Sequence, residues 1–248
     1  MRNILSILFS FFVIIGIYPQ AEQNYQFQIV RKDGEAFLKL VKYIGSESIP
    51  KVPIEFKGYK VISIGESAFS STEIKSITIP SSIIDIGKSA FYGCKKLTDV
   101  VLEEGVKSIG EGAFLGCSSL RNISLPMSLE NIGDSSFEFC SSLSKIVIPE
   151  KIIKLNCRIF ANCEKLVNVK LPTRLRNIEA LAFAWCPSLK EIEFPNTLES
   201  IGYEAFSPSG LENIIMSDSM SRISIFNSFT YAKLNIKSQL LLEKLVSK

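Results

Sequence analysis

The sequence predicts a solenoid, a fold in which short coils of chain stack on one another, and three observations predict it. Phenylalanine recurs after 22 residues once and then after 23 residues five times, at Phe69, Phe91, Phe114, Phe137, Phe160, Phe183 and Phe206. Five of these are followed by cysteine three residues later and by leucine six residues later. A fixed period of roughly 20 to 29 residues with L-x-x-L-x-L spacing is typical of leucine-rich repeats. We therefore predict short parallel β-strands in one curved sheet, loops and one-turn helices opposite, an N-terminal β-hairpin cap and a C-terminal helix.

The first residues favour export. Arg2 is followed by an uncharged run from Ile4 to Ile17, which suits the apolar part of a signal peptide and is short for a membrane span. Ala21 offers a cleavage point, but signal cleavage favours a second small residue two positions earlier, where this chain has Pro19. An uncleaved N-terminal anchor is therefore the alternative. We predict a signal peptide over residues 1–21, no membrane span in the mature chain, and a secreted or cell-surface location.

Residues 22–60 are predicted to cap the first coil. Two runs with strand character, 25–30 and 36–41, flank Asp33-Gly34, and Asp-Gly between such runs is a strong hairpin signal. The open end of a solenoid exposes apolar core and an unpaired strand edge, which a hairpin can cover.

Residues 61–229 form the predicted array. Each coil has a strand segment such as Leu120 to Leu125, and proline, which cannot donate to a strand ladder, follows five of the seven segments. Glycine then recurs where we expect a sharp bend with positive φ, at Gly65, Gly87, Gly110, Gly133 and Gly202. The Ala-Phe pair is expected to form one turn of helix.

The repeat pattern decays after Met216, although Met220 and Ile223 keep its phase. Residues 230–248 are predicted to form a helix that caps the last coil, because leucines over 231–246 fall near one helical face. A helix that binds a partner or lies on a membrane is the alternative.

Six cysteines could form three disulfides. Five of them, however, occupy one repeat position, so in a stack their side chains point the same way from neighbouring coils, which is a poor disulfide geometry. We favour buried thiols that act as small apolar residues. Cys157 lies outside this series and is the expected reactive or pairing thiol, if there is one.

Composition excludes several classes of function. The net charge of +3 is too small to predict nucleic acid as a partner, and the absence of histidine removes the commonest general base and metal ligand. Glu191 and Glu193 share a strand face and could mimic paired carboxylates, but an open sheet lacks the pocket that would shift their pKa. We predict that the protein is not an enzyme and has no catalytic residue, cofactor or metal site.

The outward positions of the strands are the candidate ligand-binding face, because side chains alternate between the two faces of a sheet. This mixed polar and aliphatic surface suits a protein or glycan ligand; a solvated face with no ligand is the alternative. The candidate residues are Asp99, Val101, Asn122, Ser124, Lys145, Val147, Asn168, Lys170, Glu191 and Glu193.

The repeat resembles the BspA-like, or treponemal-type, leucine-rich repeat family, whose signature is similar to L-x-x-I-x-I-P-x-x-L-x-x-I-G-x-x-A-F-x-x-C. Residues 120–140 match this pattern and depart from it only at Ser136; elsewhere the departures are Glu103, Asn156, Ile159 and Glu179.

The resemblance implies an exported or surface protein of the kind found in host-associated bacteria and some protists, where several members are implicated in adhesion. The function expected from it is a protein-binding scaffold for a protein or glycan on a host or neighbouring cell. The alternative is a structural array that associates with itself without a foreign ligand; the oligomeric state is left open.

Overall fold

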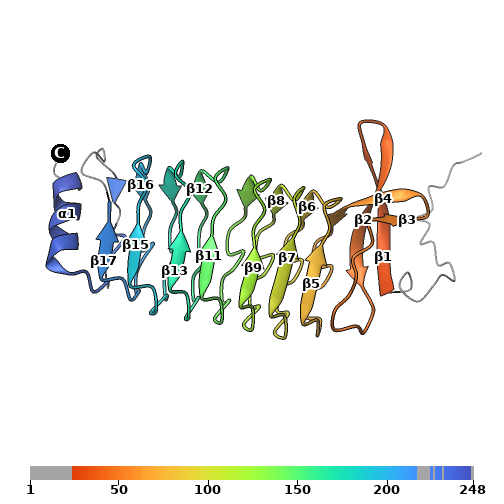
Figure 1. Cartoon of the computed structure of the whole chain (residues 1–248), viewed down its shortest axis with the longest axis horizontal. Coiled ribbons are helices and arrows are strands. Elements are labelled where there is room, and N and C mark those ends of the chain that lie inside the picture. The colour runs from red at the N-terminus through yellow and green to blue at the C-terminus, as the bar shows by residue number, and fades with distance from the viewer. Residues whose placement is uncertain (1–23, 217–223, 226, 231, 247–248) are drawn as a thin grey trace, which may run out of the picture.

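The computed structural model describes residues 24–216, 224–225, 227–230 and 232–246, and here the chain forms an elongated stack of coils between a hairpin and a helix (Figure 1). The predicted signal peptide, Met220 and Ile223 lie outside the described residues. Seven strands follow one another along one side of the stack. They are β5 (Ser76–Ile79), β7 (Asp99–Leu102), β9 (Asn122–Ser124), β11 (Lys145–Val147), β13 (Asn168–Lys170), β15 (Glu191–Glu193) and β17 (Asn213–Ile215).

A second row of strands, all of two residues except the first, runs along the stack where the sequence predicted only loops. Its members are β4 (Tyr59–Ile64), β6 (Asp85–Ile86), β8 (Ser108–Ile109), β10 (Asn131–Ile132), β12 (Lys154–Leu155), β14 (Asn177–Ile178), β16 (Ser200–Ile201) and β18 (Ser224–Ile225). Paired strands in both rows are parallel, and residues pair with their copies in the next coil, as Asp99 does with Asn122 and Ile178 with Ile201. This register confirms the predicted solenoid.

Phenylalanine rings form a continuous column inside the stack. The rings of Phe137 and Phe160 lie 5.4 Å apart and within 9° of parallel, and all seven predicted phenylalanines are fully buried. The column extends one ring further at each end, to Tyr43 and to Phe229. Each coil thus buries its ring against the coils above and below, as a repeat without a core of its own requires.

The turns around the buried phenylalanines are not the one-turn helices that we predicted. The described coils have positive φ two residues before the ring and, in most of them, again two residues after it, as at Ser135 (53°) and Phe139 (59°). A left-handed residue interrupts the right-handed helix. The Ala-Phe segment is therefore a hydrogen-bonded turn between two left-handed residues.

The predicted role of the recurrent glycines is also wrong. Gly65, Gly87, Gly110, Gly133 and Gly202 do not have positive φ. Instead they lie against the backbone of the preceding coil: a Cβ at Gly133 would lie 2.5 Å from the Glu111 nitrogen, and one at Gly110 2.6 Å from the Lys88 nitrogen. Glycine is used here for close approach of two backbones.

Asn156 occupies this glycine position in the next coil, and both strand rows open there. β9 does not pair with β11, and β10 does not pair with β12. The Asn156 side-chain amide donates to the Ile132 carbonyl at 2.6 Å, which takes the place of the backbone bond that Gly133 makes to Ile109. Glu179 also has a Cβ at this position, yet β12 and β14 remain paired. The row of β5 to β17 is open once more, between β13 and β15, but β14 and β16 remain paired there. Among the described strands, only the opening at Asn156 therefore crosses both rows, and we call it the seam.

The predicted N-terminal hairpin is present. Strands β1 (Tyr25–Lys32) and β2 (Glu35–Tyr43) are antiparallel and joined by Asp33-Gly34, both with positive φ. β2 then pairs in parallel with β4, while the short strand β3 (Glu55–Phe56) pairs with β4 on its own. Tyr43 stacks on Phe69 at 5.2 Å, so the hairpin covers the first coil.

The C-terminal helix α1 (Ile236–Val246) covers β17, the last strand of the first row (Figure 1). Asn235 caps it by accepting a hydrogen bond from the Ser238 backbone nitrogen at 2.8 Å. The hydroxyl of buried Ser238 accepts a bond from the Ile214 nitrogen at 3.0 Å, which satisfies a donor on the outer edge of β17. Leu234 and Leu242 pack against the core, as expected of a cap.

Candidate functional site

The exposed side of the strands β5 to β17, which we call the sheet face, carries the predicted ligand-binding residues. In each strand the central apolar residue points inward, and Val100, Ile146 and Ile192 are buried. Nine of the ten candidate residues are exposed and Asp99 is half-buried. The alternation expected of a strand therefore places them on one side.

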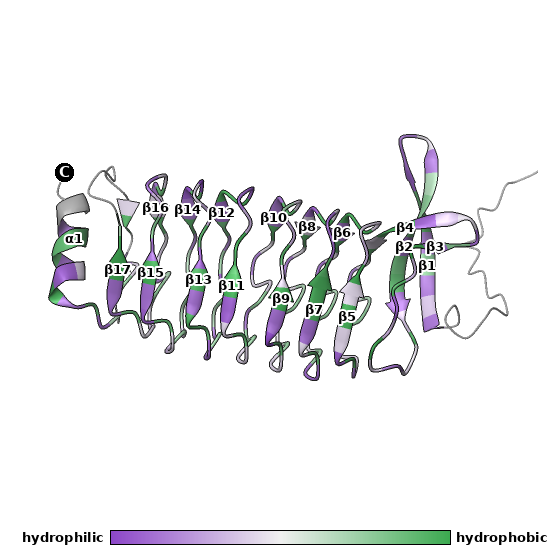
Figure 2. Cartoon of the chain, in the orientation of Figure 1, coloured by the Kyte–Doolittle hydropathy of each residue, from purple (hydrophilic) through white to green (hydrophobic). Residues whose placement is uncertain are grey.

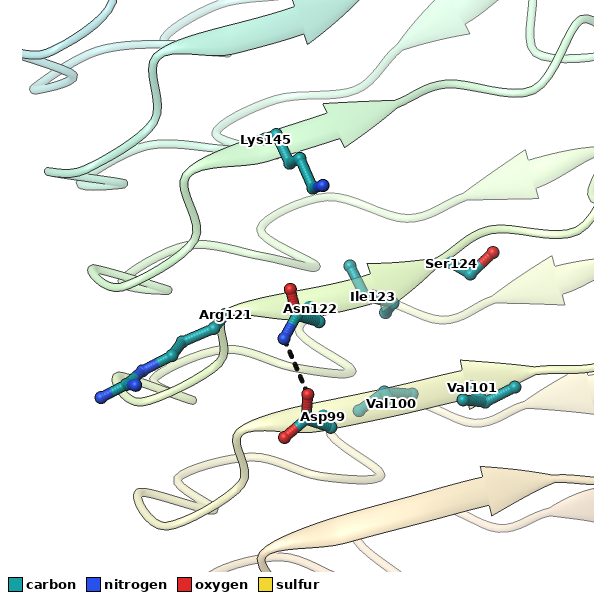
Figure 3. A pocket seen from close by; sticks show the side chains of 8 residues that line it. All are labelled: Asp99, Val100, Val101, Arg121, Asn122, Ile123, Ser124 and Lys145. Atoms are coloured by element: carbon teal, nitrogen blue, oxygen red, sulfur yellow. Dashed lines mark hydrogen bonds between the residues drawn. The ribbon is translucent and has the colours of Figure 1, made fainter.

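A polar row runs along the start of these strands. Asp99 accepts hydrogen bonds from the Thr98 hydroxyl at 2.6 Å and from the Asn122 side-chain amide at 2.8 Å (Figure 3). Both bonds lower the pKa of the Asp99 carboxyl, and the bond from Thr98 has the larger effect. Lys145, Asn168 and Glu191 continue the row along β11, β13 and β15. It carries both signs of charge and many donors and acceptors.

A second outward row contains aliphatic side chains. Val101 is 47% exposed and Val147 61% exposed, with Ser124 between them in the coil order. Lys170 and Glu193 continue this row with charged groups, and exposed Ile215 ends it on β17. Figure 2 shows β7 as largely hydrophobic and β13 and β15 as mostly hydrophilic. Apolar groups ringed by polar ones are the usual composition of a protein-binding surface.

The sheet face is hollowed where the seam crosses it. A shallow depression of about 280 Å³ lies over β7, β9 and β11, and Lys145 reaches across it from β11 toward the strand that carries Asn122 (Figure 3). Because β9 and β11 are unpaired, the backbone edges of both strands border this depression. The sequence pattern identified most of its lining but missed Arg121, which precedes the first outward position of β9 and lies beside Asp99.

A second depression, of about 430 Å³, lies on the other row of strands and was not predicted. Ile153, Arg174, Arg176 and Thr197 line it, just before β12, β14 and β16. Arg176 is paired with Glu199 at 2.7 Å, and the Thr197 hydroxyl donates to the Leu175 carbonyl. Arg176 and Thr197, two of the polar residues that line this depression, are thus already bonded to other groups of the protein.

The cysteines do not contribute to the sheet face. All six lie in the described part of the chain as free thiols, and the five in the repeat series are buried. Burial raises the pKa of Cys186 to about 12 and that of Cys140 and Cys163 well above the usual range. Cys157 is only partly buried, and its backbone nitrogen donates to Asp134 at 3.0 Å.

The described residues offer little for other kinds of chemistry. Glu191 and Glu193 lie exposed on β15, outside both depressions. Over the same residues, no cluster of three or more cysteines and carboxylates is arranged to hold a metal ion. Among the described residues, no helix has the length and apolar character needed to cross a membrane.

Three solved structures resemble this chain. A leucine-rich cell surface protein of Faecalibacterium prausnitzii is 30% identical with a TM-score of 0.73, over 81% of this chain and 54% of that one. A leucine-rich repeat protein of T. pallidum is 25% identical with a TM-score of 0.71, over 92% and 95% of the two chains. One from Bacteroides ovatus is 29% identical with a TM-score of 0.66, over 87% and 61%. This chain therefore spans about half of the Faecalibacterium protein.

No curated protein matches the chain. The family profile described as BspA type leucine-rich repeat region matches it in six copies, over residues 45–166 and 154–241. These matches together cover the whole array, including the coils that form the sheet face and both depressions. The chain belongs to the BspA-type leucine-rich repeat family.

Proposed function

We propose that this protein is an exported adhesion scaffold that binds a protein or glycan on a host or neighbouring cell through its sheet face. One observation carries the proposal: successive coils turn the same two positions outward, so side chains from β7 to β15 form a single surface. Family membership supports an interaction scaffold, and the resemblance to a cell surface protein supports the location. Export would use the segment 1–21.

The composition of the sheet face fits recognition by many modest contacts. Val101 and Val147 provide apolar area, and Asp99, Asn122 and Lys145 provide donors and acceptors around the depression. Each coil adds a strip of surface, and specific protein complexes bury about 800 Å² on each partner. Several coils must therefore contribute together. In the proposed organisation, residues 61–229 present this surface and residues 22–60 and 230–248 close its ends.

Charge reversal on the sheet face tests the proposal. We compare residues 22–248 with the double variant Lys145→Glu, Lys170→Glu in capture of surface proteins from neighbouring bacterial or host cells. The matched control is Lys107→Glu, Lys237→Glu, which makes the same charge change at exposed positions away from the sheet face. We expect a captured protein that is lost with the first variant and kept with the second, at unchanged Tm. Capture that survives the first variant would contradict the proposal.

Self-association is the second candidate, and α1 carries the observation that favours it. Ile236 and Leu240 lie one turn apart and are exposed on this helix. Apolar side chains so placed can pack against a second copy of the helix. Light scattering distinguishes the candidates: Ile236→Ser with Leu240→Ser would dissociate an oligomer if this helix forms it and would leave the particle mass unchanged if the protein is a monomer.

A further inference from the structure

Two large aromatic side chains are exposed on the turns that follow the buried rings. Phe139 and Trp185 lie two residues after Phe137 and Phe183, and they are 50% and 43% exposed. Trp185 is the only tryptophan of the sequence. Neither ring stacks on another aromatic ring within the described residues. Stacking on another ring of the described residues therefore does not account for either side chain.

The backbone at both positions disfavours a bulky residue. Phe139 and Trp185 have φ of 59° and 56°, in the left-handed region. Other coils place small or left-handed-tolerant residues here, namely Ser71, Gly93, Gly116 and Asn162. A bulky residue with positive φ is an outlier, and such strain persists mainly where function requires it. Arg158 and Leu181 also have positive φ, two residues before their buried rings, so the fold imposes this conformation on other large residues. Phe139 and Trp185 differ from them because each combines it with an exposed aromatic ring, and this combination points to a ligand.

The repeat fixes how the two rings lie relative to each other. Residues 139, 162 and 185 share one repeat position and one backbone conformation, so their side chains leave the same edge of the stack. The Phe139 nitrogen donates to Ala161 and the Asn162 nitrogen donates to Ala184, both at 2.9 Å, which joins the three coils. Below them, the core rings step by 5.4 and 5.5 Å. The exposed aromatics are therefore two coil steps apart, with Asn162 between them.

We propose that this edge, formed by Phe139, Asn162 and Trp185, binds a neutral, extended β-1,4-linked glycan. The C–H groups on one face of a sugar ring form an apolar patch that packs on the face of an aromatic ring. In such a glycan each sugar is turned over relative to the last, so alternate sugars present the same face. The coil step is close to the advance per sugar, which places alternate sugars over Phe139 and Trp185. Asn162, whose side-chain amide has no hydrogen-bond partner among the described residues, faces the sugar between them.

The proposal concerns a site separate from the sheet face. None of the three residues is charged, so a neutral glycan fits better than an anionic one. Coils before this edge have Gly93 and Gly116 at the same position, and a Cβ at Gly116 would meet only the Gly93 backbone, at 3.7 Å, so no side chain at these two positions blocks a longer glycan. An α-1,4-linked glycan coils and cannot present alternate sugars in line, so the site should reject it.

Fluorescence of the full chain tests the proposal directly, because Trp185 is both the reporter and part of the site. We expect cellohexaose or chitohexaose to change its emission saturably and maltohexaose to leave it unchanged. Phe139→Gly keeps the reporter and should weaken binding roughly tenfold or more, since one stacking contact is lost. Because glycine tolerates positive φ, this variant should have a Tm equal to or above that of the wild type.

Two controls make the result decisive. Tyr92→Ser removes an exposed aromatic from another repeat position and should not alter glycan binding. Lys145→Glu with Lys170→Glu should also leave it intact, which separates this site from the sheet face. The proposal is overturned if neither β-1,4-linked hexasaccharide gives a saturable change, if maltohexaose binds equally well, if binding survives Phe139→Gly, or if that substitution lowers Tm as removal of a packed core ring would.

Discussion

The thiol of Cys163 donates a hydrogen bond to the carbonyl oxygen of Phe137, 3.2 Å away in the preceding coil. The same bond joins four further pairs: Cys94 to Phe69, Cys117 to Phe91, Cys140 to Phe114 and Cys186 to Phe160. Cysteine suits this position because it is small and apolar and still offers a weak donor to a buried carbonyl. The cysteine series is thus part of the contact between coils.

Thiol reactivity should separate Cys157 from the others. The five thiols of the repeat series are buried away from the reagent, and this includes Cys94, although hydrogen bonds with Cys117 and Thr72 lower its pKa to about 7. In the native protein at pH 8 only Cys157 should therefore react readily with iodoacetamide. After denaturation without a reductant, all six should react. Mass spectrometry of the alkylated protein counts them. Fewer than six modified cysteines after denaturation would show that a disulfide had formed.

Removal of one ring from the middle of the aromatic column should destabilise the array strongly. Phe137 is fully buried between two stacked rings, so Phe137→Ala should lower the free energy of unfolding by about 3–5 kcal/mol. Phe229 is partly buried at the end of the column, and Phe229→Ala should cost less. Urea denaturation measures both. Equal losses would argue against stability that depends on both neighbouring coils.

The glycines that face the preceding coil should not tolerate a side chain. In Gly133→Ala the new Cβ would meet the backbone of Glu111, and we expect a loss of about 1–3 kcal/mol with weaker hydrogen-exchange protection at β10. Gly112→Ser is the control, because serine occupies the same repeat position at Ser89 and Ser135. The control should be nearly neutral. A neutral Gly133→Ala would contradict the close-approach role.

These glycines show where sequence reasoning failed. The period identified which residues recur, and recurrence sufficed to predict the buried column and the outward rows. It does not reveal backbone dihedral angles: positive φ falls on Ser135 and Phe139, which local preference would not select, and not on Gly133. It also does not reveal distances between coils, so the second row of strands was missed.

The sheet face shows the same limit on what the sequence pattern can predict. Its ten residues were predicted because alternation along a strand determines which side chains point outward. The seam beside Asn122 was not predicted, although the sequence departs from glycine at Asn156. Its effect depends on how two backbones adjust to one extra side chain, which no pattern within a single coil describes.

Acid should weaken the contacts between coils. Glu104 accepts hydrogen bonds from the backbone nitrogens of Met127 and Ser128, and these bonds lower its pKa. Glu150 accepts hydrogen bonds from the hydroxyl and from the backbone nitrogen of Thr173. Both bonds lower the pKa of Glu150, and the bond from the hydroxyl has the larger effect. A carboxyl whose pKa is lower in the folded than in the unfolded protein stabilises the fold fully at pH values above its pKa in the unfolded chain. That stabilisation is lost as the pH falls through the pKa of the carboxyl in the folded protein.

The free energy of unfolding should therefore decrease between about pH 5 and pH 3, around the ordinary pKa of glutamate. Urea denaturation at a series of pH values measures this slope. Glu104→Gln removes one titrating group and should make the slope shallower. Stability that rises on acidification, or a slope that Glu104→Gln leaves unchanged, would contradict this role of the carboxylates.

The central claim is that side chains from successive coils form one continuous, rigid face, and a distance between spin labels tests it most directly. With Cys157→Ser to remove the accessible thiol, labels at Val101→Cys and Glu193→Cys occupy the same outward row four coils apart. Strand spacing predicts one narrow distance distribution centred at about 20 Å. A broad distribution, or one centred beyond about 30 Å, would contradict a continuous face.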